Sequence, residues 1–227
     1  MDEMEPVWHR ETVDARVERT LRDLHNVPIL KSFYLAGGTG LALRLGHRLS
    51  ADLDFFVGED FNEDYVLQKL QHLDGFATIA KEPGTIYANI CKTKVSFIAY
   101  AYPILFPFQL FLGVNVADSR DIGCMKISAI ASRGTKRDFI DLYRLAQEYD
   151  LKQLLGWFKT KFSQTNYSIP HILKSLSYFE EAEQDPMPHM LIPLSWEDVK
   201  QFFAREAPRL ILGFTSEPIS DRGRFFF

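Results

Sequence analysis

Apolar residues recur along the chain at spacings typical of helices and of strands. Val13, Val17 and Leu21 stand four residues apart among charged positions, which predicts a helix over 6–26 that ends at Pro28. Similar patterns predict further helices over 39–45, 62–73, 122–132, 136–149, 151–162, 168–183 and 196–206. Apolar or alternating runs predict strands over 32–36, 52–57, 85–91 and 94–100, with a hairpin turn at Lys92 and Thr93.

The order of these elements predicts an α+β (mixed α/β) fold. Strands and helices are mixed in the first half, a Pro- and Phe-rich loop follows over 102–111, and only helical patterns come afterwards. We therefore expect a small mixed sheet with flanking helices, followed by a helical C-terminal half. The expected division is an α/β region over 1–117 and a helical region over 118–227. The last residues, Arg222–Phe227, fit no element.

Composition and charge narrow the functional classes. Hydrophobic residues make up 46% and charged residues 25%, which is typical of a globular protein. No apolar run approaches the ~20 residues of a membrane span, and the acidic N-terminal sequence is unlike a signal peptide, so we expect a cytoplasmic protein and no membrane partner. Cys91 and Cys124 lack metal-site spacing and are expected to be reduced thiols. The net charge of −4 means that any RNA would have to be bound locally.

Gly37, Gly38 and Thr39 stand between a predicted strand and a predicted helix. Glycines at a helix start let backbone N–H groups approach an anion such as a triphosphate, although the same pair is also typical of a plain tight turn. The Thr39 hydroxyl suits either a helix cap or a phosphate oxygen. A dinucleotide-binding motif would need a glycine at Leu43, and no Gly-Lys-Ser/Thr motif of P-loop enzymes occurs.

Asp52 and Asp54 strengthen the phosphate interpretation. Residues two apart on a strand point to the same face, so both carboxylates converge beside apolar neighbours. Such a pair is costly without a cation, and carboxylate oxygens suit Mg²⁺, which also binds substrate phosphates. The alternative is a pair of solvated aspartates on an edge strand.

The run from Gly37 to Phe56 (GGTGLALRLGHRLSADLDFF) closely resembles the nucleotidyltransferases of the AbiEii/AbiGii toxin family, within the polymerase-beta-like superfamily. A second similar block runs from Met125 to Tyr143, and the resemblance covers most of 25–205. It implies a cleft completed by the helical half, with a nucleoside triphosphate as substrate and Mg²⁺ (or Mn²⁺) as cofactor at Asp52 and Asp54.

The second block supplies further candidate residues. Lys126 and Arg133 share one helix face, which fits phosphate binding or a solvated basic face, and the resemblance assigns Lys126 to the nucleotide phosphates. Asp138 falls where a capping box places its acidic residue, whereas helical spacing puts Asp141 on a solvated salt-bridge face. The resemblance associates both aspartates with the active site. Ser96 occupies the strand position where many members of the superfamily carry a third carboxylate.

The expected function is metal-dependent transfer of a nucleotidyl group to an acceptor hydroxyl by the toxin of a bacterial toxin–antitoxin pair. Resemblance implies RNA, tRNA in particular, as an acceptor, and a separately encoded antitoxin as a partner. Two alternatives stay open, namely a small-molecule nucleotidyltransferase of the antibiotic-modifying kind and a catalytically weak nucleotide-binding regulator suggested by Ser96. The sequence names neither the base, the acceptor, the oligomeric state nor the antitoxin.

Overall fold

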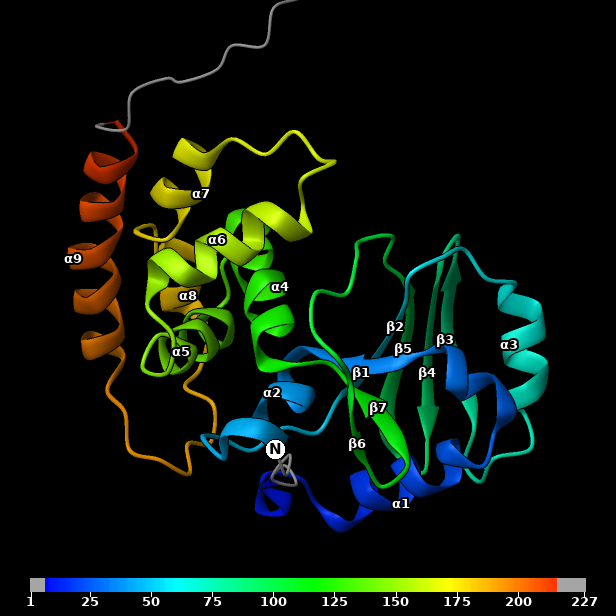
Figure 1. Cartoon of the computed structure of the whole chain (residues 1–227). Helices are drawn as coiled ribbons and strands as arrows, with labels where there is room; N and C mark the ends of the chain where they lie inside the picture. The colour runs from blue at the N-terminus through cyan, green and yellow to red at the C-terminus, as the bar shows by residue number, and fades with distance from the viewer. Residues whose placement is uncertain (1–6, 216–227) are drawn as a thin grey trace, which may run out of the picture.

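The protein, seen as a computed structural model that describes residues 7–215, combines one mixed sheet with a group of helices (Figure 1). Within these residues the seven strands lie in the order β3-β4-β5-β2-β1-β7-β6. Their bounds are β1 Tyr34–Ala36, β2 Leu53–Val57, β3 Ala77–Glu82, β4 Thr85–Ile90, β5 Thr93–Ala99, β6 Gln109–Phe111 and β7 Val114–Val116. Helices α4 to α9 follow the last strand, so the predicted mixed α/β fold class is confirmed.

The helices are bounded by sequence signals that can be identified individually. Their ranges are α1 Ala15–His25, α2 Gly37–Leu45, α3 Glu63–Leu70, α4 Ser119–Ser132, α5 Lys136–Leu145, α6 Leu151–Lys161, α7 Ile169–Ser175, α8 Glu180–Gln184 and α9 Trp196–Thr215. Asp14 caps α1 through the backbone N–H groups of Arg16 and Val17, which is why this helix begins later than the predicted residue 6. Gly46 ends α2 with a φ of 65°, as expected of a glycine stop.

Four predictions of secondary structure were incomplete or misplaced. The loop assigned to 102–111 was wrong at its end, because 109–111 form β6, which pairs with β7 in a hairpin whose turn residues Leu112 and Gly113 have φ values of 50° and 81°. Strand β3 was missed because it is almost wholly exposed and shows no apolar alternation. The helix predicted over 168–183 is two helices, α7 and α8, and the β4–β5 turn lies at Cys91 and Lys92.

Two apolar cores hold the sheet and the helices together. One lies where α1 and α3 cover a face of the sheet, around Leu21, Phe55 and Phe97. The other joins the central strands β1 and β2 to the helical half, around Phe56, Ile127 and Phe139. Helix α2 lies between the halves and contacts β1, β2, α4 and α5 (Figure 1).

The strands end at Val116 and α4 begins at Ser119, while the division into regions 1–117 and 118–227 stays a prediction. Residues Arg222–Phe227 lie outside the described residues. Between residues 7 and 215, no helix is both long enough and apolar enough to cross a bilayer.

Candidate functional site

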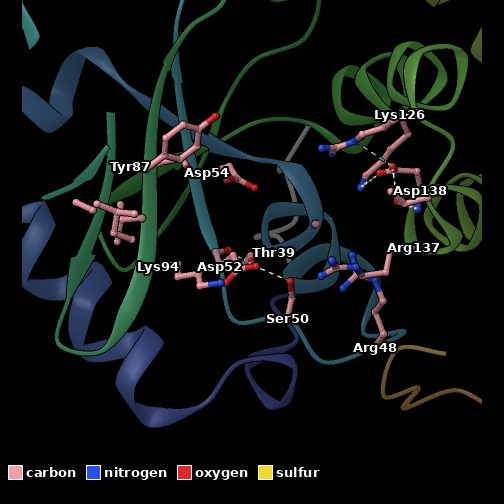
Figure 2. Close-up of a pocket in the computed structure, with 17 residues that line it drawn as sticks. Thr39, Arg48, Ser50, Asp52, Asp54, Tyr87, Lys94, Lys126, Arg137 and Asp138 are labelled. Carbon is pink, nitrogen blue, oxygen red and sulfur yellow. Dashed lines mark hydrogen bonds and ion pairs between the residues drawn. The ribbon is translucent and has the colours of Figure 1, made fainter. Parts of the chain in front are cut away.

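A cleft of about 450 Å³ lies between the open face of the sheet and helices α4 and α5. Figure 2 shows Asp52, Asp54, Lys94 and Tyr87 on its sheet side and Lys126, Asp138 and Arg137 on its helix side. It is also lined by Gly38, Thr39, Arg48, Ser50, Ile79, Ala88, Val95, Ser96, Arg133 and Thr135. The structure thus brings together predicted residues that stand up to about a hundred positions apart in the sequence.

Strand register determines the sheet side of the cleft. Asp54 of β2 is paired with Ser96 of the parallel strand β5, which is paired in turn with Tyr87 of β4. Side chains at paired positions point to the same face, so these three form a row across the sheet. Burial raises the pKa of Asp54, as does the nearby Asp52, while a hydrogen bond from Ser96 lowers it. Ser96 therefore stabilises the carboxylate form of Asp54.

The donor set at Asp52 and Asp54 fits a divalent cation. Neither carboxylate forms an ion pair with a side chain of the described residues, although Asp54 is half-buried. Within residues 7–215 there is no cluster of three or more His, Cys, Asp or Glu side chains that could hold a metal. A Mg²⁺ ion here would have two protein carboxylates as ligands and take its others from substrate phosphates and water, a common arrangement for this metal.

The glycine segment begins α2 directly, two residues before the predicted start at Thr39. Gly37 has a φ of 63°, and a Cβ there would lie 2.8 Å from Asp54 Oδ2. At Gly38 a Cβ would lie 2.6 Å from Arg48 Nη2. Both glycines therefore leave room for charged groups of the cleft. This is a steric reason for glycine, in addition to the predicted approach of backbone N–H groups to an anion.

Thr39 is buried, and its hydroxyl is hydrogen-bonded within the protein. It donates to the backbone oxygen of Asp52 and lies 2.8 Å from the Ser50 hydroxyl. This contact connects α2 to the segment that leads into β2 and so positions Asp52. The predicted role of Thr39 in binding phosphate stays a prediction.

Lys126 and two aspartates form a buried cluster on the helix side. Lys126 Nζ lies 2.8 Å from Asp138 Oδ1 and 2.7 Å from Asp141 Oδ2. Although burial alone lowers the pKa of Lys126, the two carboxylates raise it, so the amine stays charged. The Thr135 hydroxyl donates to Asp138 Oδ2 and also caps α5.

Asp141 is fully buried, so the interpretation as part of a solvated face was wrong. Its Oδ1 accepts from Arg48 Nε at 2.7 Å, and its Oδ2 accepts from Arg48 Nη2 at 2.8 Å. His47 Nε2 lies 2.8 Å from Oδ1. Burial raises the pKa of Asp141, but Lys126 and Arg48 hold it well below its ordinary value. Helical spacing could not reveal this, since the partners come from a distant loop. We call Arg48, His47, Lys126, Asp138 and Asp141 the buried charge network.

His47 and Arg48 were not among the predicted site residues. The sequence gives only a weak indication of them, because a His-Arg pair that follows the glycine at the end of a helix has no particular functional meaning. The structure holds this segment by backbone pairing with residues 189–191: Leu49 N donates to His189 O at 2.9 Å, and Leu191 N donates to His47 O at 2.9 Å. Arg48 and Met190 form the bridge between the two segments.

Cations with few protein partners surround the mouth of the cleft. Lys94 on β5 and Arg137 on α5 are exposed and form no ion pair with the described residues. Arg133 ends α4, has a side chain that is 71% exposed, and lies 3.8 Å from Asp138 Oδ2. Three exposed positive charges of this kind suit a polyanion such as a triphosphate.

A second cavity, of about 690 Å³, adjoins the first. The two share Arg48, Ser50, Asp52 and Arg137, so they meet at the predicted metal carboxylate. The remaining lining is partly apolar and partly acidic: Glu11, Thr12, Val13, Asp14, Leu49, Ala51, Asp185, Pro186, Met187, Pro188 and His189.

The sequence matches a known protein family and a bacterial relative. The family model described as nucleotidyl transferase AbiEii toxin, type IV toxin–antitoxin system, matches residues 19–110 and 96–216. An uncharacterized protein of Aquifex aeolicus (strain VF5) is 37% identical over 192 residues, which are 82% of this chain and 91% of that protein.

A solved structure has the same fold. MenT4, a nucleotidyltransferase toxin from Mycobacterium tuberculosis H37Rv, superposes with a TM-score of 0.52 at 18% identity, covering 86% of this chain and 88% of its own. JHP933 from Helicobacter pylori has a TM-score of 0.45 at 17% identity, and the superposition covers 88% of this chain and 94% of JHP933. The family match extends over most of the chain and includes both the glycine–aspartate segment and the second block. The chain therefore belongs to the AbiEii family of nucleotidyltransferase toxins of type IV toxin–antitoxin systems.

Proposed function

We propose that the protein transfers the nucleotidyl group of a nucleoside triphosphate to a hydroxyl of RNA, tRNA in particular, with Mg²⁺ (or Mn²⁺) held by Asp52 and Asp54. The observation that carries this is one cleft that brings two carboxylates, which form no ion pair with the described residues, together with the exposed cations Lys94, Arg133 and Arg137. The bound metal would neutralise phosphate charge and favour the leaving of pyrophosphate.

The protein's own residues position the reactants. Arg133, Arg137 and Lys94 bind the β- and γ-phosphates, while the backbone around Gly37 and Gly38 leaves space for them. Lys126, held by its aspartates, adds positive charge at the back of the cleft. Phosphoryl transfer depends chiefly on such positioning and electrostatic stabilisation.

The covalent step needs a proton acceptor for the attacking hydroxyl. A bond forms between the acceptor oxygen and the α-phosphorus, the bond from that phosphorus to the bridging oxygen breaks, and pyrophosphate leaves with the electron pair. Asp138 receives the proton, because it lines the cleft whereas Asp141 is completely buried. Asp141 acts as a positioning residue for Lys126 and Arg48. Ser96 positions Asp54 rather than replacing a third carboxylate.

The decisive experiment is incubation of the purified chain with each labelled nucleoside triphosphate, total RNA and Mg²⁺. We expect label in RNA, release of pyrophosphate, and loss of both in Asp54→Asn and Asp138→Asn. Triphosphate binding without pyrophosphate release would instead identify the nucleotide-binding regulator.

The toxin role and the antitoxin partner are tested in cells. Induced expression of the wild type should arrest growth, Asp54→Asn should not, and co-expression of the separately encoded antitoxin should restore growth. Equal growth with both forms would contradict a toxin that acts through this site.

A second candidate is transfer to a cationic small molecule of the antibiotic kind. The acidic residues Glu11, Asp14 and Asp185 around the second cavity favour it, since a polyamine would pair with them. The cavity volume of about 690 Å³ also lies in the range of small-molecule sites. Label that enters an aminoglycoside but not total RNA would select this candidate.

A further inference from the structure

Tyr87 is a large aromatic side chain exposed inside the cleft. It is 40% exposed and lies on the sheet side, level with Ser96 and Asp54 (Figure 2). Among the described residues its ring has no aromatic or cationic partner, and its hydroxyl has no hydrogen bond. Core tyrosines of this protein behave differently: Tyr34, for example, is buried and stacks on Phe56 and Phe108.

A β-bulge places a second apolar side chain beside it. The β3–β4 pairing shifts between Thr78 and Ala80, so that Ile79 is an extra residue opposite Tyr87. Ile79 is 54% exposed and lines the same cleft. Bulges near active sites commonly redirect one side chain, and here the redirected residue extends the apolar surface of Tyr87.

We propose that Tyr87 and Ile79 form the platform on which the base of the nucleoside triphosphate stacks. This inference rests on the proposed function. It assigns one end of the cleft to the phosphates of the nucleotide and the other end to its base. Asp54 lies on the row from Tyr87, Asp52 precedes it by two residues and lines the same cleft, and the three exposed cations lie around the same mouth. A nucleotide with its phosphates at Asp52 and Asp54 therefore directs its base along the sheet toward Tyr87.

The position of the second cavity supports a nucleotide whose base points toward Tyr87 rather than away from it. It meets the cleft at Asp52, Arg48 and Arg137, and neither Tyr87 nor Ile79 lines it. An acceptor that reaches the α-phosphorus through this cavity leaves the Tyr87 end for the base. Because the platform carries no amide or carboxylate, it contacts the face of a base rather than its edge, so its contribution should be similar for all four bases.

The test measures binding of ATP, GTP, CTP, UTP and inorganic tripolyphosphate to the full chain with Mg²⁺. Tyr87→Ala should raise the Kd of each nucleotide that binds by roughly 5- to 150-fold, the range found when a stacking aromatic is removed. The Kd of tripolyphosphate, which has no base, should stay within about twofold, and it reports that the variant is folded. Tyr87→Phe keeps the ring and should bind like the wild type.

Tyr65→Ala is the matched control, because Tyr65 is an exposed tyrosine (53%) on α3 that does not line the cleft. If the wild type binds neither nucleotides nor tripolyphosphate, the proposed function itself fails. If it binds both and Tyr87→Ala leaves nucleotide affinity unchanged, the platform is wrong while the proposed function stands. A rise in KM for the acceptor alone would place the acceptor at Tyr87 and overturn the inference.

Discussion

Replacing Asp141 with asparagine tests whether the buried charge network stabilises the fold. The carboxylate accepts two hydrogen bonds from Arg48 and lies 2.8 Å from His47 Nε2 and 2.7 Å from Lys126 Nζ. Asparagine removes the negative charge and turns an N–H donor toward groups that are donors themselves. Two buried cations then lose a partner.

The expected cost follows from burial. Exposed ion pairs contribute about 0–1 kcal/mol, whereas removing one partner of a buried pair costs about 3–5 kcal/mol, because the remaining charge stays in a poorly solvated place. For a chain of this size that corresponds to a fall in Tm of about 6–20 °C.

Chemical and thermal unfolding followed by circular dichroism measure this difference. Asp64→Asn is the control, since Asp64 pairs with Lys81 at 2.8 Å but its side chain is 80% exposed. We expect this variant to lose less than about 1 kcal/mol. If Asp141→Asn were as stable as Asp64→Asn, the network would not contribute to stability as argued.

Acid unfolding gives an independent check with a defined sign. Burial raises the pKa of Asp141, but Lys126 and Arg48 together hold it well below its ordinary value. The contribution of this carboxylate to the free energy of unfolding is therefore complete above the unfolded-state pKa of about 3.9. That contribution is lost as the pH falls below this value toward the folded-state pKa. The free energy of unfolding of Asp141→Asn should therefore decline less between pH 4 and pH 2 than that of the wild type.

Two further predictions concern the cleft. Gly38→Ala places a Cβ 2.6 Å from Arg48 Nη2, so it should lower the free energy of unfolding by about 1–3 kcal/mol, measured by urea unfolding, and weaken triphosphate binding, measured by titration calorimetry. Gly58→Ala is the control: its Cβ meets nothing within 4 Å, and it should change neither quantity. Asp54→Asn should raise the Tm of the metal-free protein, because it removes a half-buried carboxylate beside Asp52, and should abolish the further rise in Tm on adding Mg²⁺ and nucleotide. An unchanged response to Mg²⁺ and nucleotide would contradict the metal assignment.

The sequence was most informative where one local pattern decides the structure. Helical spacing, capping residues and the Gly46 stop located most helices. The i, i+2 spacing of Asp52 and Asp54 brought both to the cleft, with Asp54 on β2 and Asp52 immediately before that strand. Hairpin β6–β7 escaped because each strand has only three residues, too few to show alternation. Its best signal was the Leu112-Gly113 turn.

The site could not be predicted as completely, because its partners meet through tertiary packing. Helical spacing assigns a residue to a face, but it does not say which distant charge will cover that face, and Asp141 is the clearest case. Arg48 and His47 reach it from 93 and 94 residues away. Tyr87 likewise looked like an ordinary strand residue until the register placed it level with Asp54.

The pairing of residues 47–49 with 189–191 also has a consequence for the time at which the site is completed during synthesis. Roughly 140 residues separate Arg48 from Met190, and a ribosome adds about 5–20 residues per second, so the second segment is made about 7–28 s after the first. Until then the backbone around Arg48 lacks its partner segment, although Asp141, which holds the guanidinium, has already been made. A chain released early would carry every residue that lines the cleft but not the segment that pairs with the backbone around Arg48. The pairing that holds the Arg48 segment is thus among the last contacts of the site to form during synthesis.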